Sequence, residues 1–323
     1  MVVQLGIIGY RNQAERLITL AETNPKCNLK YIFHPNKKIS DKRVTNNLND
    51  LFSCDAIIIS SPNSTHYEYI KKLSHYSGYV FCEKPPVTTF EELKKLKKLN
   101  ENKKRKIFFN FNYRFSELNN ILKKYLNSKT IGEIIDIRIV AAQGLAFKKE
   151  YSKSWRADGK NNKHNLLNTV AIHYLDLIIK NLGIMKHQSY FHRNISKNGT
   201  SYDTIQLILT YERFNVSITN SYATPFIGEL ELIGTNGYLS IKDNILKIHS
   251  PRNTFNKNNY FILPPITLQK KFNIQKDYSI SLKKSFEFFV SKISRKGIFE
   301  RELFETSLLT TQLILENQIS KKK

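Results

Sequence analysis

The sequence predicts an α/β protein in which an N-terminal doubly wound parallel sheet is followed by an α+β domain with an open, mostly antiparallel sheet. Two observations carry this prediction. Through residue 115, short apolar strands alternate with helical segments, as βαβ units require. Beyond Arg114, strand-like segments follow one another through short turns such as Thr235–Gly237, which favours antiparallel pairing. We therefore expect one domain over residues 1–116 and a second over residues 117–323.

The elements of both domains have local signals. Continuous apolar runs indicate buried strands, and apolar residues at helical spacing indicate helices. Threonines three positions ahead of Glu91 and Glu92 mark a capping box at the start of one helix. In the first domain we expect strands at residues 2–8, 29–33, 55–60, 79–84 and 106–111, and helices at residues 14–20, 65–74 and 88–98. In the second we expect strands at residues 134–142, 204–211, 215–221, 230–233, 238–241 and 245–248, and helices at residues 115–125, 166–180 and 302–316.

Length and composition indicate a globular protein, because 323 residues of which 41% are hydrophobic can form two cores. The N-terminus has no basic leader, and no apolar run reaches the roughly 18 residues that span a bilayer. We expect a soluble, cytoplasmic protein. The three cysteines, Cys27, Cys54 and Cys82, are odd in number and widely spaced, so we expect small core residues rather than disulfides or a metal site.

The net charge of +24, from 51 basic and 27 acidic residues, raises nucleic acid or an anionic membrane as a partner. The lysines are scattered in pairs without a long basic arm, and asparagine and isoleucine are likewise abundant. A compositional drift toward these three residue types explains the charge. We expect no specific nucleic acid and no membrane partner, while non-specific polyanion binding at low salt stays open.

A lysine lies where a strand ends, in the run from Tyr79 to Pro86. Pro85 cannot extend the strand, so Lys84 is at its carboxyl end. Ligands bind at that edge of an open parallel sheet, which favours a chemical role for Lys84. By itself a Glu-Lys-Pro tripeptide is better explained by an ordinary surface turn, so the rest of the chain must decide.

The turn after the first strand has the pattern GxGxxA, with arginine at the second glycine position. Gly9 makes the tight turn, and Ala14 lets the following helix pack on the strand. Arg11 either crowds a pyrophosphate with its Cβ or reaches a phosphate from the side, and both alternatives stay open. The helix N-terminus is an anion site in either case. The simpler alternative is the first turn of any α/β sheet.

The second strand ends at His34, where an NAD site places an acid against the ribose hydroxyls. No acid is present in this stretch of sequence. His34 with Lys37, Lys38 or Arg43 accommodates the 2′-phosphate of NADP, so NADP is as credible as NAD. The same residues are also compatible with weak binding of either cofactor.

Taken in order, the motifs resemble the Gfo/Idh/MocA family of NAD(P)-dependent oxidoreductases. Their order and spacing match over nearly the whole chain, and the ordered set is more specific than any single motif. The matching residues are Gly9 and Ala14, Ser61–Asn63 with His66, Val80–Pro85, Asn112 and Arg114, Ile131–Ile134, Trp155 and Arg156, His173 with Asp176, and Gly234–Gly237.

The resemblance implies a Rossmann domain that binds NAD or NADP, and a C-terminal domain that covers the substrate and forms a homo-oligomer through its sheet. The implied activity is hydride transfer between nicotinamide and a carbinol or carbonyl carbon of a sugar, sugar nucleotide or polyol. The implied cofactor-binding residues are Gly9, Tyr10, Arg11, Ala14, His34, Ser61, Pro62, Asn63, His66, Glu83 and Lys84. The implied substrate-binding residues are Arg114, Trp155, Arg156 and Asn165.

The resemblance also implies that Lys84 hydrogen-bonds the reacting hydroxyl and that His173 is the general acid/base. Many members have an aspartate four residues before this histidine, where this chain has Thr169. Threonine hydrogen-bonds a substrate but takes no proton, so the acid/base role falls to His173. A spacing of four places both side chains on one face of a helix.

Departures from the family pattern at Arg11, His34 and Thr169 leave an alternative. In it, the protein is a catalytically degenerate member that keeps the fold and a ligand pocket but binds cofactor weakly. Without the resemblance, His173 on an apolar helix is more simply a hydrogen-bonded core histidine, and Trp155 a packing residue. A polyanion binder, which rests on charge alone, is the third alternative.

Overall fold

The computed structural model describes residues 2–35 and 39–319. The chain divides into two compact units, of which the first comprises the residues through Asn112 together with Leu282–Glu316. The second comprises Tyr113–Ser281 and the residues from Asn317 onward. The division after Asn112 lies close to the boundary expected at residue 116, whereas the sequence patterns place residues 282–316 in the second domain. The extent of each functional domain stays a prediction.

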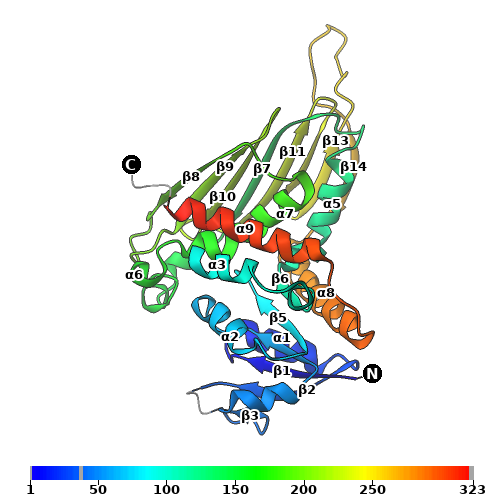
Figure 1. The fold of residues 1–323 in the computed structure, drawn as a ribbon. Helices are drawn as coiled ribbons and strands as arrows, with labels where there is room; N and C mark the ends of the chain where they lie inside the picture. The colour runs from blue at the N-terminus through cyan, green and yellow to red at the C-terminus, as the bar shows by residue number, and fades with distance from the viewer. Residues whose placement is uncertain (1, 36–38, 320–323) are drawn as a thin grey trace. The chain divides into compact units, whose positions relative to one another are not determined.

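The first unit contains a six-stranded parallel sheet in the order β3-β2-β1-β4-β5-β6 (Figure 1). Since β1 pairs with β2 on one side and β4 on the other, the sheet is doubly wound, as the sequence predicts. Its strands are β1 (Val3–Ile8), β2 (Cys27–Phe33), β3 (Val44–Thr45), β4 (Ala56–Ile59), β5 (Tyr79–Glu83) and β6 (Ile107–Asn110). The α-helices between them are α1 (Gln13–Glu22), α2 (His66–Lys72), α3 (Phe90–Lys97) and α4 (Glu101–Lys104), and short 3₁₀ turns are η1 (Leu48–Ser53) and η2 (Asn63–Thr65).

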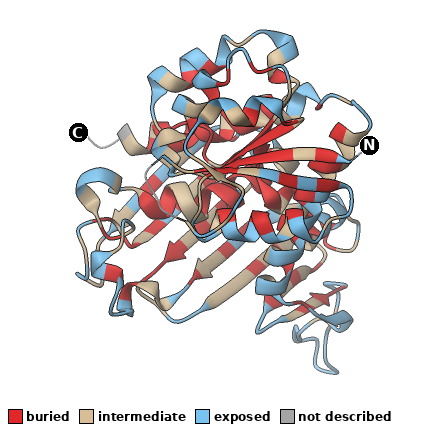
Figure 2. Ribbon diagram, turned by 90° about the horizontal axis from the view of Figure 1, so that it is seen from below, coloured by how far each residue is buried: buried red, intermediate tan, exposed pale blue. Residues whose placement is uncertain are grey.

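The parallel strands are buried on both faces, which is why continuous apolar runs predict them. Every residue of β4 and β6 is buried, and in Figure 2 several strands have the colour of buried residues along much of their length. The capping box also forms as predicted. The Thr89 side chain accepts a hydrogen bond from the Glu92 amide, and the Thr88 amide donates to the Glu92 carboxylate at 3.0 Å.

The helices α8 (Ile274–Ser294) and α9 (Arg301–Ile319) supply residues to the core of the first unit. Phe289 of α8 packs edge-on against Phe81 of β5, with 5.2 Å between ring centroids, and stacks on Phe299 at 5.7 Å. The sequence predicts α9 but not α8, because a run of adjacent aromatic residues shows no clear helical period. Its aromatic side chains are explained by partners that are distant in sequence.

The second unit contains an eight-stranded sheet in the order β14-β13-β12-β11-β7-β10-β9-β8, and only the β7–β10 pair is parallel (Figure 1). This confirms the open, mostly antiparallel sheet. The strands are β7 (Ile134–Ala142), β8 (His187–Arg193), β9 (Thr204–Thr210), β10 (Asn215–Ser221), β11 (Ile227–Gly234), β12 (Tyr238–Lys242), β13 (Ile245–His249) and β14 (Ile266–Lys271). The sequence patterns miss β8 and β14. Both are edge strands, and all six residues of β14 are exposed, so neither has the burial that leaves a clear apolar pattern.

The large sheet is buried on one face only, which antiparallel sheets allow. In the central strands Ile137 and Leu232 are fully buried, whereas the neighbouring positions Arg138 and Glu231 point to the other face and are partly exposed. The outward face of the sheet therefore carries mixed polar and apolar side chains.

The helical segments of this unit are η3 (Asn112–Phe115), α5 (Glu117–Tyr125), η4 (Gly144–Phe147), η5 (Tyr151–Lys153), α6 (Gly159–Asn162), η6 (Leu167–Ala171) and α7 (Ile172–Leu182).

A long arm, residues 250–265, connects β13 to β14 and projects from the sheet (Figure 1). Three large side chains of this arm are among the most exposed apolar residues, with Tyr260 at 69%, Phe261 at 82% and Leu263 at 69% of their surface accessible. Such a group of apolar side chains is unusual on a protein that functions alone.

The helix expected over residues 166–180 is not uniformly α-helical, which corrects that prediction. Leu167–Ala171 form a π-helical turn that continues into α7. Within it the Thr169 hydroxyl donates to the Asn165 carbonyl oxygen at 2.7 Å, a back-bond to the preceding turn that competes with regular helix geometry. The α-helical spacing used to place Thr169 and His173 on one face therefore does not apply at Thr169.

Among the described residues, no helix combines the length and the apolar character that crossing a membrane requires. Cys27, Cys54 and Cys82 are buried and unbridged, as expected for small core residues. No group of three or more potential metal ligands occurs in the described part of the chain.

We expect Phe289→Ala to lower the unfolding free energy by about 3–5 kcal/mol, because it leaves a cavity among Phe81, Phe108 and Phe299. The neighbouring variant Phe288→Ala is the matched control, since Phe288 is only half-buried, and it is expected to cost clearly less. Urea unfolding followed by circular dichroism measures both. Equal losses in the two variants would contradict the packing described for α8.

Candidate active site

The carboxyl ends of the parallel strands carry the predicted residues of the first unit. Gly9 follows β1, Ser61 follows β4, and Lys84 follows β5. β1 and β4 are neighbours whose connections leave in opposite directions, so their carboxyl ends form the topological switch point of the sheet. This is where open α/β sheets bind ligands, as the sequence analysis expects for Lys84.

The turn between β1 and α1 fits a dinucleotide phosphate. Gly9 has φ +113°, and a Cβ there would lie 2.5 Å from the Ser60 carbonyl oxygen, so only glycine is accommodated. Ala14 is fully buried, which permits close packing of α1. Arg11 is exposed, and no side chain caps the N-terminus of α1, an arrangement that is compatible with an anion bound there.

His66 links the turn after β4 to the turn after β5. Its Nδ1 lies 2.8 Å from the Pro85 carbonyl oxygen and its Nε2 lies 3.0 Å from that of Ser61. Burial lowers the pKa of His66, although both carbonyl contacts act in the opposite direction. The Lys84–Pro85 peptide bond is cis, and the Lys84 side chain is half-buried. His66 thus positions the segment that carries Lys84.

Glu83 lies at the centre of a buried hydrogen-bond network that the sequence analysis does not predict. Its Oε1 accepts from Asn110 Nδ2 at 2.7 Å and from Gln13 Nε2 at 3.0 Å. Asn110 Oδ1 accepts in turn from the Ser285 hydroxyl at 2.6 Å. Burial raises the pKa of Glu83, while its two amide donors and the charge of Lys84 lower it. The network joins α1, β5, β6 and α8.

The basic residues that the sequence places near a 2′-phosphate of NADP differ from one another in their surroundings. His34 is half-exposed at the end of β2, whereas Lys37 and Lys38 lie outside the described residues. Arg43 pairs with Asp41 at 2.6 Å and with Glu22 at 2.8 Å. This pairing lowers the pKa of Asp41 to about 2. Because two carboxylates hold the Arg43 guanidinium, His34 is the better placed of the described bases.

In the second unit, Arg114 forms a buried two-pronged ion pair with Asp176. Arg114 Nε donates to Oδ2 at 2.7 Å and Nη2 donates to Oδ1 at 2.5 Å. The two side chains are only 4% and 1% exposed. Breaking such a pair costs about 3–5 kcal/mol, so the geometry supports a structural role, whereas substrate binding by Arg114 stays a prediction.

His173 lies in the first turn of α7 and is 8% exposed. Its ring packs on that of Tyr113, with 4.9 Å between centroids and 30° between planes. Burial raises the pKa of Tyr113, so its phenol stays protonated near neutral pH. His173 belongs to the second unit and Lys84 to the first, and the role of each stays a prediction.

Three residues predicted to contact substrate or its reaction do come together: Arg156, Asn165 and Thr169. Asn165 Nδ2 donates to the Arg156 carbonyl oxygen at 3.2 Å, and the backbone carbonyl oxygen of Asn165 accepts from the Thr169 hydroxyl. A residue missed by the sequence analysis, Tyr222, places its hydroxyl 3.1 Å from Thr169 Oγ1. Trp155 is 47% exposed and stacks on the Arg156 guanidinium. Trp155 is therefore no buried packing anchor.

The remaining predicted cofactor contacts surround the same edge of the parallel sheet. Tyr10 and Asn63 are half-exposed and Pro62 is exposed, in the turns that follow β1 and β4. The residues missed here are Gln13, Asn110 and Ser285. Asn110 is paired with Glu83 in the β5–β6 register, so a strand-end signal was present for it alone. Ser285 is distant in sequence and leaves no local signal.

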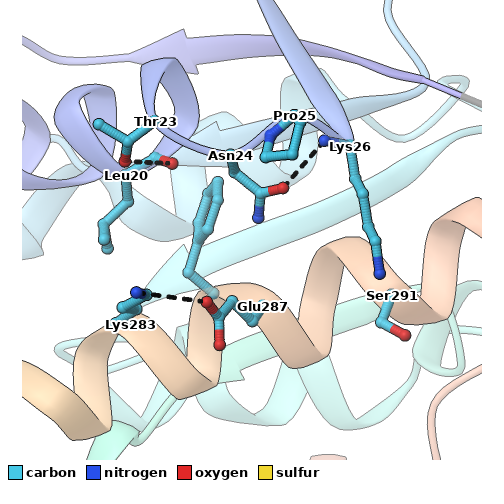
Figure 3. A pocket seen from close by; sticks show the side chains of 9 residues that line it. Leu20, Thr23, Asn24, Pro25, Lys26, Lys283, Glu287 and Ser291 are labelled. Atoms are coloured by element: carbon cyan, nitrogen blue, oxygen red, sulfur yellow. Dashed lines mark hydrogen bonds and ion pairs between the residues drawn. The ribbon is translucent and has the colours of Figure 1, made fainter.

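A surface pocket of about 480 Å³ lies elsewhere in the first unit, between the end of α1 and α8 (Figure 3). Its lining includes Thr23, Lys26 and Glu287, and Glu287 pairs with Lys283 at 3.8 Å. The connection from α1 to β2 lies at the amino ends of the strands. The pocket is therefore at the edge opposite to Lys84, and none of the predicted site residues lines it.

We expect the unfolding free energy to decrease as the pH is lowered, because two histidines are held neutral in the folded protein. Burial, His192 and Lys163 lower the pKa of His164 to about 4, and burial lowers that of His66. The unfolded chain, with histidine pKa values of about 6.5, binds more protons, so the unfolding free energy decreases as pH falls below about 6.5. For His164 the loss continues to about pH 4. Urea unfolding between pH 7 and pH 5 measures it.

His164→Gln is expected to flatten this pH dependence, because the substituted side chain does not titrate. His75→Gln, at an exposed histidine, is the control and keeps the slope of the original chain. Identical slopes in His164→Gln and the original chain would show that His164 is not held neutral in the folded state.

Two family models match the chain in order. Residues 3–111 match a model described as an oxidoreductase family with an NAD-binding Rossmann fold, and residues 120–240 match the GFO/IDH/MocA C-terminal domain. The solved structure of an oxidoreductase from Agrobacterium radiobacter, described in complex with NAD⁺, L-tartaric acid and magnesium, aligns with TM-score 0.79 at 16% identity. It covers 100% of this chain and 98% of that one, which shows the fold.

Named relatives match over shorter stretches. Glucose-6-phosphate 3-dehydrogenase of Bacillus subtilis is 26% identical over 54% of this chain and 52% of its own length. Inositol 2-dehydrogenase of Rhizobium meliloti is 28% identical over 31% of this chain and 30% of its own length. The chain thus matches about half, or less, of each relative. Because models of both domains match in sequence order and together cover more than half of its residues, the chain belongs to the Gfo/Idh/MocA family of oxidoreductases.

Proposed function

We propose that this protein is an NAD- or NADP-dependent oxidoreductase that transfers a hydride between nicotinamide and a carbinol or carbonyl carbon of a sugar, sugar nucleotide or polyol. The observation that carries the proposal is Lys84 at the carboxyl end of β5, on the same sheet edge as the phosphate-compatible turn at Gly9. Relatives named for glucose 6-phosphate and for inositol support this substrate class. A cytoplasmic location is part of the same proposal.

The cofactor is proposed to lie along the switch point of the parallel sheet. Gly9 and the first amides of α1 would hold the pyrophosphate, with the Arg11 guanidinium beside it. His34, at the end of β2, would face the adenosine ribose, and the turn from Ser61 to Asn63 with Tyr10 would flank the dinucleotide. When bound, the dinucleotide supplies the hydride acceptor or donor.

Lys84 is proposed to donate a hydrogen bond to the reacting oxygen and to stabilise the negative charge that develops on it. His66 and Glu83 are proposed to act through Lys84, because they hold the turn that carries it. His173 is proposed to take the hydroxyl proton as general base in oxidation and to return it in reduction. Thr169 has no titratable group, so its proposed contribution is a hydrogen bond.

A homo-oligomer formed through the large sheet is also proposed. The outward face of this sheet is partly exposed, and the arm at residues 250–265 presents exposed apolar side chains next to it. Covering this surface with a second copy of the chain would remove it from water. Because the arm contributes apolar side chains to this surface, its proposed partner is a second copy of the chain rather than an anionic macromolecule.

Titration with NADH and NADPH, followed by fluorescence, tests the cofactor proposal. We expect saturable binding of at least one of them, and absence of binding at millimolar concentrations would refute it. Lys84→Ala and His173→Ala are each expected to lower kcat by about 10²- to 10⁴-fold while leaving cofactor affinity nearly unchanged. Lys98→Ala, at an exposed lysine after α3, is the control and should keep full activity.

The oligomer proposal predicts a mass that depends on the arm. Phe261→Ser combined with Leu263→Ser removes two exposed apolar side chains, so the variant should sediment at lower mass than the original chain at equal concentration. Ile184→Ser, at a similarly exposed residue outside the arm, is the control. A monomeric original chain, or an unchanged mass in the double variant, would exclude this role for the arm.

A further inference from the structure

We infer that the substrate carries an anionic substituent, a phosphate or a carboxylate, which is bound in the second unit by Arg156 with Tyr222 and Asn165 beside it. This inference rests on the proposed function and narrows its substrate class. It begins from a partly buried cation that has no acidic partner in the described part of the chain.

The Arg156 guanidinium is held in place but its charge is not neutralised. Its Cζ lies 4.6 Å from the centre of the Trp155 ring, and its backbone carbonyl oxygen accepts from Asn165 Nδ2 and from the Ser201 hydroxyl. No carboxylate among the described residues forms an ion pair with it, in contrast to the buried Arg114. Stacking leaves the donors at the guanidinium edge available for a planar or tetrahedral anion.

The buried carboxylate of Asp203 is engaged by other partners and forms no ion pair with Arg156. Both oxygens of Asp203 accept backbone hydrogen bonds at 2.8 Å, from the amides of Ile195 and Ser196. The Thr204 hydroxyl also donates to this carboxylate. Asp203 stabilises its own loop, and the Arg156 charge is left for an external partner.

The hydroxyl contacts around Arg156 can be assigned a direction. Burial raises the pKa of Tyr222, so its phenol is protonated near neutral pH, although Arg156 acts in the opposite direction through a hydrogen bond. The single proton of Thr169 is used toward the Asn165 carbonyl oxygen, so Tyr222 donates to Thr169. The Tyr222 oxygen is then an acceptor for the Arg156 guanidinium. Tyr222 therefore orients this cation.

Asn165 supplies the complementary acceptor. It is 1% exposed, and its Oδ1 has no hydrogen-bond partner among the described residues. A buried amide oxygen without a donor is costly, by about 1–3 kcal/mol, and a ligand hydroxyl would satisfy it. One guanidinium and one open carbonyl-type acceptor are the groups needed to bind a sugar that bears both an anion and hydroxyls.

The surrounding segment attracts anions. Residues 148–163 contain six basic and two acidic side chains, and several of these lysines are exposed. His164 adds no positive charge at neutral pH, because its pKa is lowered to about 4. The local excess of cations raises the concentration of an anionic sugar near Arg156, and this effect weakens as salt is added.

Steady-state kinetics with glucose, glucose 6-phosphate and glucuronate tests the inference. We expect kcat/KM for one anionic sugar to exceed that for glucose by about 10- to 100-fold. Arg156→Gln should abolish this ratio mainly through KM, and Arg156→Lys should restore part of it. Arg213→Gln, at an exposed arginine that pairs with Glu133 in the same unit, is the control. The preferred anion distinguishes a phosphate from a carboxylate.

Two outcomes would overturn the inference while leaving the proposed function standing: equal kcat/KM for all three sugars, or an equal loss on every sugar in Arg156→Gln. Calorimetric titration of the original chain with the same compounds covers the case in which none is turned over. Binding of an anionic sugar that disappears in Arg156→Gln supports the site without any activity. If neither anionic sugar binds more tightly than glucose, the inference fails even if the proposed oxidoreductase activity is observed with another substrate.

Discussion

The arrangement at the carboxyl edge of the parallel sheet depends on His66, whose two ring nitrogens face the carbonyl oxygens of Ser61 and Pro85. Both partners are backbone atoms in turns that follow neighbouring strands, so one imidazole determines the separation of these turns. The His66 side chain is fully buried, so losing either contact would leave a buried polar group without water to replace it. This constraint holds the turn that carries Lys84. His66 holds the two turns at a fixed separation, and the burial of its ring lowers its pKa.

Glu83 extends the same principle to the end of the chain. Its carboxylate accepts hydrogen bonds from the side-chain amides of Gln13 in α1 and Asn110 in β6. Asn110 accepts in turn from the Ser285 hydroxyl of α8. A buried carboxylate is tolerated because donors satisfy it on several sides. The network therefore couples the phosphate-compatible turn, the strand that leads to Lys84 and helix α8, whose Ser285 lies 175 residues beyond Asn110 in sequence. It also explains why residues 282–316 belong to the first unit, together with the aromatic packing of Phe289.

The positions at which this chain departs from the family pattern have local physical explanations. Arg11 is exposed, so its side chain is free of the core and available beside the helix N-terminus. Thr169 joins a chain of hydroxyl contacts with Tyr222 instead of presenting a charge. Position 169 carries no carboxylate to offset the positive charge of Arg156, and this absence supports our inference of an anionic substrate. These departures lie within a fold and a family that both halves of the chain share.

The sequence by itself determined the doubly wound sheet, the capping box at Thr89, the position of Lys84 at a strand end and, through the ordered motifs, the family. These features are encoded locally, in apolar periodicity and turn residues that each strand or helix carries within itself. Tertiary structure alone decided the π-helical turn at Thr169, the membership of residues 282–294 of α8 in the first unit, the engagement of Arg43 by two carboxylates and the partners of Glu83 and Arg156. Several of these depend on contacts between residues far apart in sequence, such as Glu83 with Gln13 and Thr169 with Tyr222, where burial and hydrogen bonding override local preference.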